Sequence, residues 1–261
     1  MDRTLQDETV FVTGASSGIG AACVRAFAAH GARVVLAARR TERLQALAKE
    51  LKAPSHVVTL DVRDRAAVER AVASLPEEFA NVTVVVNNAG GALGLEPLHE
   101  ASIEDFETMI DTNIKGLLYV TRALLPGMVA RNRGYVINIG SIAGSYPYAG
   151  GNVYCGAKAF VRQLSLCLRA DLLGTNIRVT DIEPGLCETE FSIVRFHGDV
   201  ERARKVYEGL SPLTAEDIAD LVLFCVTRSP HVNINTLEVM PLMQAPGGPA
   251  VRRFVTGGQG S

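Results

Sequence analysis

The stretch "TGASSGIG", residues 13–20, joins an apolar segment to a segment with helical periodicity. The apolar segment, "TVFVTG" at 9–14, predicts a β-strand, and residues 19–30 predict an α-helix. In open α/β sheets, the turn between the first strand and the first helix is where the pyrophosphate of a dinucleotide binds. The stretch therefore predicts a nucleotide-binding α/β fold.

The glycines of this turn have separate physical roles. Gly14 permits a tight turn, Gly18 lets the backbone approach the phosphates, and Gly20 lets the helix pack closely on the sheet. The helix N-terminus offers unpaired N–H groups to the phosphates. The spacing is G-x-x-x-G-x-G rather than the G-x-G-x-x-G of many dehydrogenases, and a simple tight turn is the alternative. The predicted cofactor-binding residues of the turn are Gly14, Ser16, Ser17, Gly18, Ile19 and Gly20.

Apolar runs and helical patterns alternate along most of the chain. Further strands are expected at 32–39, 56–62, 82–90, 134–141, 176–185 and 236–241, with helices at 41–52, at 64–75, from about 102, from about 150, and in two segments after 185, the second from about 214. Alternation with short connections implies parallel strands joined by right-handed crossovers. The predicted fold class is α/β, a doubly wound, mainly seven-stranded parallel sheet with helices on both faces. This Rossmann-like fold forms a single domain over residues 1–245, and the Gly/Pro-rich residues 246–261 form a tail.

The helix expected from residue 102 carries a start signal and a stop signal. Ser102 followed by Asp105 is a capping box, with Ser102 as the N-cap. Pro126 cannot donate a backbone hydrogen bond, so the helix is expected to kink or end near this residue.

The overall composition argues against several classes of function. The chain has 261 residues, 48% of them hydrophobic, and a net charge of −2, which suits one large domain and disfavours nucleic-acid or membrane-surface partners. Five scattered cysteines without a C-x-x-C pair and five histidines without ligand-like spacing predict no disulfide framework and no metal site. The start lacks an apolar signal-peptide segment, and no run reaches the ~18 apolar residues of a membrane span. We therefore expect a cytoplasmic protein.

The end of the second predicted strand indicates which nucleotide binds. NAD-binding sheets usually carry an acidic residue about 20 positions after the glycine-rich turn, where it bonds the ribose 2′-hydroxyl. Here the positions 18 to 20 after Gly20 hold Ala38, Arg39 and Arg40, and no carboxylate. Guanidinium groups match phosphate geometry. Arg39 and Arg40 therefore favour NADP(H) over NAD(H), with a solvated basic helix start as the alternative.

A second chemical motif lies in "GGNVYCGAKAF", residues 150–160. Tyr154 and Lys158 are four residues apart, so a helix places them on the same face. An ammonium beside a phenol favours phenolate and lowers a tyrosine pKa that starts near ~10. The pair could act as an acid or base near neutral pH. Taken alone, it could equally be an ordinary helix with one aromatic residue and one solvated lysine.

These motifs together resemble those of the short-chain dehydrogenase/reductase family, over roughly residues 7–243. Their order and spacing are more specific than any one of them. In chain order they are "TGASSGIG" (13–20), "DV" (61–62), "NNAG" (87–90), "TN" (112–113), "NIGS" (138–141), "YCGAK" (154–158) and "PG" (184–185).

The resemblance implies a catalytic set of Asn113, Ser141, Tyr154 and Lys158. In this family pattern Tyr154 is the general acid/base, and Lys158 lowers its pKa and holds the nicotinamide ribose hydroxyls. Ser141 hydrogen-bonds the substrate carbonyl or hydroxyl, and Asn113 anchors a water relay to Lys158. The further cofactor contacts that the resemblance implies are Asp61 and Val62 at the adenine, Asn88 at the cofactor backbone region, Pro184 and Gly185 at the nicotinamide amide, and Thr189.

Longer stretches, such as "RVTDIEPGL" (178–186), resemble the NADP-dependent 3-hydroxy acid dehydrogenases. That group oxidises serine, allo-threonine and 3-hydroxypropionate-type acids, or reduces malonic semialdehyde, and is typically a cytoplasmic homotetramer. The loop at 185–199 also resembles the sulfoacetaldehyde reductases. Both substrate classes are small anions, so Arg195 and Tyr148 are candidate substrate ligands beside Ser141 and Tyr154. A surface arginine and a packed tyrosine are the alternatives, and in a tetramer the tail could reach a neighbouring subunit.

Other functions stay open at this point. A non-catalytic NADP-binding regulator on the same fold is one, although a regulator has no need of the four catalytic residues. A sugar-nucleotide epimerase usually carries a longer C-terminal substrate domain, and an enoyl reductase spaces its tyrosine and lysine further apart.

Overall fold

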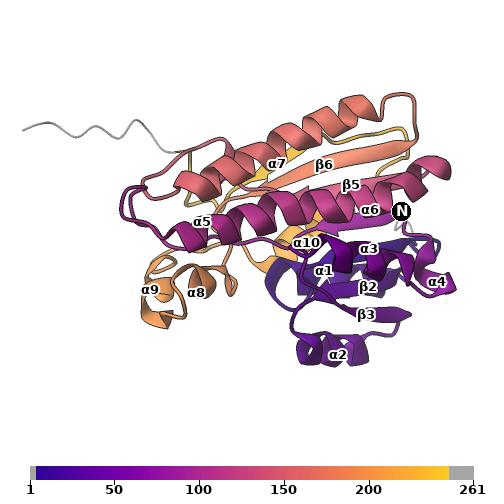
Figure 1. Cartoon of the computed structure of the whole chain (residues 1–261), viewed down its shortest axis with the longest axis horizontal. Coiled ribbons are helices and arrows are strands. Elements are labelled where there is room, and N and C mark those ends of the chain that lie inside the picture. Colours follow the sequence, from indigo (N-terminus) through magenta and orange to yellow (C-terminus); the bar gives the residue numbers. More distant parts are fainter. Residues whose placement is uncertain (1–3, 247–261) are drawn as a thin grey trace, which may run out of the picture.

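Seven parallel strands form one sheet in the order β3-β2-β1-β4-β5-β6-β7 (Figure 1). The computed structural model describes residues 4–246, so residues 247–261 of the predicted tail lie outside the described residues. The predicted seven-stranded parallel sheet is confirmed, with strands that are shorter than the apolar runs. Their bounds are β1 Thr9–Thr13, β2 Arg33–Ala38, β3 Ser55–Thr59, β4 Val84–Asn87, β5 Gly134–Ile139, β6 Ile177–Pro184 and β7 Thr236–Val239.

Helices cover both faces of the sheet (Figure 1). One face packs against α1 (Gly18–Ala29), α2 (Thr41–Glu50) and α10 (Ala215–Thr227). The other packs against α3 (Arg65–Ala73), α4 (Glu77–Ala80), α6 (Leu117–Ala130) and α7 (Asn152–Asp171). Among the helices between residues 4 and 246, none combines the length and apolar character that crossing a membrane requires.

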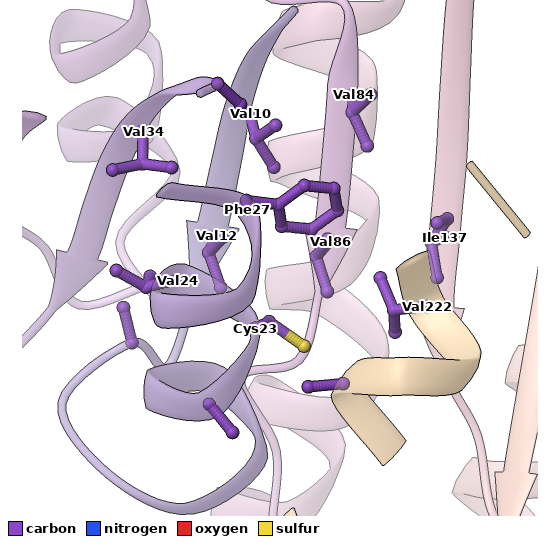
Figure 2. Packing of buried hydrophobic residues seen from close by; sticks show 14 of the residues in the cluster. Val10, Val12, Cys23, Val24, Phe27, Val34, Val84, Val86, Ile137 and Val222 are labelled. Atoms are coloured by element: carbon purple, nitrogen blue, oxygen red, sulfur yellow. The ribbon is translucent and has the colours of Figure 1, made fainter. Parts of the chain in front are cut away.

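The strands separate two hydrophobic cores because successive side chains point to opposite faces. In β1, Val10 and Val12 belong to the core under α1, whereas Phe11 belongs to the core under α6. Figure 2 shows Cys23 and Phe27 of α1 facing the valines of β1 and β4. Burial on both faces explains why the strand sequences are continuous apolar runs rather than alternating ones.

The order of the strands reverses at β1. From β1 the sheet continues through β2 and β3 on one side and through β4 to β7 on the other. In doubly wound sheets the crevice at such a switch point, at the carboxyl ends of the strands, is where ligands bind. The turn after β1, which contains the glycines of residues 13–20, lies at this point.

Of the two outcomes predicted at Pro126, a kink or an end of the helix, the structure rules out the end. Helix α6 continues past Pro126 to Ala130, and Leu124 and Met128 on either side of the proline are buried, so tertiary packing holds the helix together there. The irregular winding lies earlier, in a π-helical segment, η1 (Asp111–Gly116), which follows α5 (Ile103–Ile110). A π-helical turn is a common feature of functional sites.

The predicted helix starts are confirmed, whereas the number of helices after β6 is not. Ser102 is the predicted N-cap, since its Oγ accepts a hydrogen bond from Asp105 N at 3.2 Å, which is one of the two bonds of the predicted capping box. Thr214 begins α10 with both bonds of a capping box. Instead of two helical segments, three follow β6 up to residue 246, because the loop contains the short helices α8 (Phe191–Arg195) and α9 (Val200–Lys205) before α10.

Candidate active site

A cavity of about 730 Å³ opens at the carboxyl ends of the strands. The glycine-rich turn, the end of β2 and helix α8 contribute to its wall, together with the N-terminal part of α7. It brings together predicted residues from distant parts of the sequence. Those that line it are Gly14, Ser16, Ser17, Gly18, Ile19, Arg39, Arg40, Asp61, Val62, Asn88, Ser141, Tyr148, Tyr154, Lys158, Pro184, Gly185, Thr189 and Arg195.

Gly20 lies behind the cavity wall, where it allows a close contact. A Cβ atom at Gly20 would lie 2.4 Å from the carbonyl oxygen of Gly14 and 2.5 Å from Asn88 Nδ2. Asn88 in turn donates from Nδ2 to Thr13 O at 2.9 Å. Gly14 itself has φ +65°, a conformation that favours glycine. The turn is therefore held against the end of β4, and the first turn of α1 follows at Gly18.

Arg40 is bound to the glycine-rich turn by two serine hydroxyls. Its Nε donates to Ser16 Oγ at 3.0 Å, and its Nη2 donates to Ser17 Oγ at 2.6 Å. Arg39 is exposed at the same end of the cavity. This arrangement offers guanidinium and hydroxyl donors where the sequence predicts a 2′-phosphate, which is the chemistry such a group requires.

A carboxylate that the sequence did not predict also lies at this end. Glu190, which directly precedes α8, accepts from Arg40 Nη1 at 2.8 Å and from Arg43 Nη1 at 2.6 Å. Glu190 and Arg40 are 150 positions apart. No local pattern in the sequence links them, and only the tertiary structure brings them together.

Asp61 and Val62 follow β3 and reach the cavity by different contacts. The Asp61 carboxylate forms an ion pair with Arg63 at 2.6 Å, and this hydrogen-bonded partner lowers the pKa of Asp61 below its usual value. Val62 is buried, and a Cβ atom at Gly116 would lie 2.6 Å from Val62 Cγ2. The adenine contact predicted for both residues stays a prediction.

Tyr154 and Lys158 lie on one face of α7, as their spacing predicts. Both side chains are buried, and Lys158 Nζ lies 5.8 Å from the centroid of the Tyr154 ring. Lys158 Nζ donates to the carbonyl oxygen of Ile139, the last residue of β5, at 2.8 Å. Ser141, two residues after β5, accepts from Ala143 N at 3.1 Å and caps the 3₁₀ turn η2 (Ile142–Gly144). The strand end thus holds both groups near Tyr154.

Asn113 lies in the π-helical segment and is fixed by backbone groups. Its Nδ2 donates to Gly91 O at 2.9 Å and to Met109 O at 2.8 Å, and its Oδ1 accepts from Gly91 N at 3.2 Å. A Cβ atom at Gly90 would lie 2.6 Å from Asn113 Oδ1 and 3.6 Å from Lys158 Nζ. Asn113 on η1 and Lys158 on α7 therefore both lie close to Gly90, which suits the predicted water relay between them.

Burial dominates the proton equilibria of this group. Burial raises the pKa of Tyr154, while the hydrogen bond with Ser141 and the charge of Arg195 act in the opposite direction. Burial also lowers the pKa of Lys158 to about 8, and the charge of Asp181 opposes this effect. The expected lowering of the Tyr154 pKa by Lys158 does not outweigh burial in this structure. The phenol is therefore protonated at neutral pH.

Arg195 and Tyr148 also line the cavity, and Arg195 lies beside Tyr154. Arg195 Nη2 donates to the Tyr148 hydroxyl, and the Arg195 guanidinium carbon lies 5.4 Å from the ring centroids of Tyr148, Tyr154 and Phe191. Its buried Nε has no hydrogen-bond partner among residues 4–246. This cation is thus packed among aromatic rings with a donor to spare, next to the predicted general acid.

Two further carboxyl groups, which the sequence did not predict as part of the site, lie buried on β6. Asp181 and Glu183 on β6 are each 1% exposed, and Arg162 Nε of α7 lies 3.1 Å from Glu183 Oε1. Neither oxygen of Asp181 accepts a hydrogen bond from an N–H or O–H group in the part of the chain that the structure describes. Burial and then the Glu183 charge raise the pKa of Asp181. The charge of Lys158 acts on the pKa of Asp181 in the opposite direction, so the two groups are coupled electrostatically.

The segment from α8 to α9 closes the substrate end through polar contacts. Gly94 N donates to Arg195 O at 2.9 Å, and His197 Nε2 lies 3.0 Å from Asp105 Oδ2 on α5. Arg202 and Glu96 form a longer ion pair at 3.8 Å. These contacts connect the segment to the loop after β4 and hold Arg195 over the cavity.

Comparisons of the sequence and of the structure with known proteins both find dehydrogenases. The family model described as short chain dehydrogenase matches residues 8–198. The NADP-dependent 3-hydroxy acid dehydrogenase YdfG of Salmonella typhi is 60% identical over 245 residues, covering 94% of this chain and 99% of the relative. The serine 3-dehydrogenase of Agrobacterium fabrum is 48% identical, covering 94% and 98% respectively. A solved structure of the closed form of serine dehydrogenase complexed with NADP+ aligns with a TM-score of 0.93 and 58% identity, over 94% of this chain and 99% of that one.

Proposed function

The chain belongs to the short-chain dehydrogenase family, and on that premise we propose that it is an NADP(H)-dependent oxidoreductase of small 3-hydroxy acids. It would interconvert these acids with their semialdehydes or ketones, malonic semialdehyde and 3-hydroxypropionate being one pair and serine and allo-threonine being further substrates. The names of its 60% and 48% identical relatives support this assignment.

The observation that carries the proposal is the position of Arg195. Its guanidinium carbon lies 5.4 Å from the centroid of the Tyr154 ring, and its buried Nε has no partner within residues 4–246. An arginine fork binds a carboxylate with charge-assisted hydrogen bonds. A substrate held there by its carboxylate has its carbon chain beside the Tyr154 phenol. Tyr148, whose hydroxyl bonds Arg195, orients the guanidinium.

The residues present fit NADP(H). Ser16, Ser17, Arg39 and Arg40 supply donors for the 2′-phosphate, and the N-terminus of α1 supplies N–H groups for the pyrophosphate. Pro184, Gly185 and Thr189 also line the cavity, and we assign them to the nicotinamide end of the cofactor. When bound, the cofactor supplies or accepts the hydride.

The chain's own residues manage the proton that accompanies the hydride. Reduction of a carbonyl builds negative charge on its oxygen, and Tyr154, which burial keeps protonated, donates its proton there. Ser141 donates a hydrogen bond to the same oxygen and holds it near the phenol. Lys158 and Asn113 lie behind Tyr154 and restore its proton through the predicted water relay. A positioned acid of this kind contributes about 10²–10⁴-fold to the rate.

The alternatives are weaker. The sulfoacetaldehyde reductase reading has no support among the relatives described above, although a sulfonate would fit the same cation. A non-catalytic regulator has no use for Asn113, Ser141, Tyr154 and Lys158 gathered at one point. A homotetramer and a cytoplasmic location are further parts of the proposal, and both rest on the family resemblance.

The test is steady-state absorbance at the nicotinamide band with the purified protein. NADPH and NADH are each supplied with malonic semialdehyde and with sulfoacetaldehyde, and NADP with serine, allo-threonine and 3-hydroxypropionate. We expect turnover with the carboxylate substrates and a strong preference for NADPH. A preference for sulfoacetaldehyde would keep the mechanism and change the substrate class. A protein that turns over none of these compounds would contradict the proposed function.

A further inference from the structure

Glu190 connects the substrate segment to the arginines at the cofactor end of the cavity. Its two carboxylate oxygens bind two different guanidinium groups, Oε2 that of Arg40 at 2.8 Å and Oε1 that of Arg43 at 2.6 Å. Arg40 follows β2, Arg43 lies on α2, and Glu190 comes from the loop before α8. The hydrogen bond from Arg40 in particular holds the pKa of Glu190 below its usual range, so the group is an anion at neutral pH.

The donors that Glu190 uses belong to the group assigned to the 2′-phosphate. Arg40 donates hydrogen bonds from Nε and Nη2 to Ser16 and Ser17, and from Nη1 to Glu190. A phosphate bound by Ser16, Ser17 and Arg40 would therefore meet the Glu190 carboxylate on the same guanidinium. Two anions on one guanidinium repel each other. The phosphate monoester, with a charge of about −1.5 to −2, is attracted more strongly to that guanidinium than the singly charged carboxylate is.

We propose that Glu190 is an internal anion that occupies the 2′-phosphate subsite until NADP(H) binds, and that the 2′-phosphate takes over Arg40 from it. This inference rests on the proposed NADP(H) dependence and adds a residue that sets cofactor specificity. A cofactor without the 2′-phosphate carries no group that displaces Glu190. The exchange frees Glu190 from Arg40 and leaves Arg43 of α2 as its partner, so the adenosine end of the cofactor and the substrate segment become linked through one carboxylate.

The test compares Glu190→Gln with the wild type by calorimetric titration. The probes are adenosine 2′,5′-bisphosphate, which carries the 2′-phosphate, and ADP, which does not. Removing the carboxylate removes two half-exposed ion pairs that compete with the phosphate, so we expect Glu190→Gln to bind the 2′-phosphate probe about threefold to twentyfold more tightly. Affinity for ADP should change less than about twofold. The gain should shrink as salt is raised, because salt screens exposed charges.

Glu188→Gln is the matched control. Glu188 lies two residues earlier, is exposed, and has as its described contact the backbone hydrogen bond from its N–H to Leu213 O. It removes the same charge from the same segment, and we expect no more than about a twofold change with either probe. Melting temperatures of both variants verify that the fold is retained.

Several results would overturn the inference. If Glu190→Gln binds the 2′-phosphate probe more weakly, Glu190 holds the arginines in place rather than competing for them. If it tightens both probes equally, or no more than Glu188→Gln does, the effect is one of overall charge. If the wild type does not prefer NADPH to NADH, the proposed cofactor itself is wrong, whereas a clear preference with no gain in Glu190→Gln rejects this inference alone.

Discussion

The guanidinium of Arg195 lies against the ring of Tyr154, with its central carbon 5.4 Å from the ring centroid. This places a cation next to the phenol that we propose as the general acid. In a 3-hydroxy acid, the carbon that gains or loses hydride is separated from the carboxylate carbon by one methylene or substituted carbon. A carboxylate on Arg195 and an oxygen on Tyr154 therefore fit one small molecule, and longer acids would not place both groups correctly.

Arg195→Ala removes the proposed anion-binding group and leaves the Tyr154 hydroxyl, the proposed general acid, in place. We expect kcat/KM for malonic semialdehyde to fall about tenfold to hundredfold, which corresponds to the loss of a charge-assisted hydrogen bond of ~1.5–3 kcal/mol. Activity on propanal, an aldehyde of the same chain length without a carboxylate, should change by less than about threefold. An equal loss with both aldehydes would mean that Arg195 serves the structure of α8 rather than the substrate.

Tyr154→Phe removes the proton donor and keeps the ring. We expect kcat to fall about 10²–10⁴-fold while the Kd for NADPH, measured by fluorescence titration, stays within about twofold. Tyr146→Phe is the control, because Tyr146 also lines the cavity and its hydroxyl donates to Glu238 Oε1 at 3.2 Å. A Tyr154→Phe enzyme with near-normal turnover would refute the assigned role.

Lys158 makes stability depend on pH at the alkaline side. Its folded-state pKa of about 8 lies below the value of 10.5 for an ordinary lysine. Between these two values the unfolded chain binds more protons, so this group makes the free energy of unfolding rise with pH. As pH rises from 8 to 10.5, the free energy of unfolding of Lys158→Met should therefore fall by about 3 kcal/mol relative to that of the wild type. Urea unfolding at several pH values measures this, and a constant difference would contradict it.

Asp181 has the opposite effect, because it makes the free energy of unfolding fall as pH rises from acid values. Burial raises its pKa above the ordinary value of 3.8, so the folded protein binds more protons than the unfolded chain above that pH. Its contribution to stability is present at low pH and is lost as pH rises through the folded pKa. Asp181→Asn should therefore gain stability over the wild type between pH 4 and 7, by on the order of 1 kcal/mol or more. Asn substitution of the exposed Asp171 at the end of α7 should show no such trend.

Local patterns predicted the parts of the fold that short sequence separations decide. The turn at 13–20 and the pair Tyr154 and Lys158 depend on residues within one or two turns of chain, and the structure places them as expected. The helix does not end at Pro126, one of the two outcomes predicted there, because the packing of α6 rather than local propensity sets where that helix ends. The contact of Glu190 with Arg40 spans 150 positions, and no periodicity encodes it. The Asp181 and Glu183 pair shows the same limit, since burial depends on the complete sheet.

The reversal of strand order at β1 also bears on how the sequence can change in evolution, because the two ends of the site come from two separate stretches of the chain. The groups assigned to the adenosine end, such as Ser16, Arg40 and Asp61, come from the segments before β5, whereas Tyr154 and Arg195, which are assigned to the substrate, come after it. Substitutions that adapt a descendant to a new metabolite thus fall in a stretch of gene apart from those that choose its nucleotide. Glu190 crosses this division, because it lies in the later stretch and binds Arg40 of the earlier one, so under the proposed exchange the inheritance of a new substrate loop would also alter the choice of nucleotide.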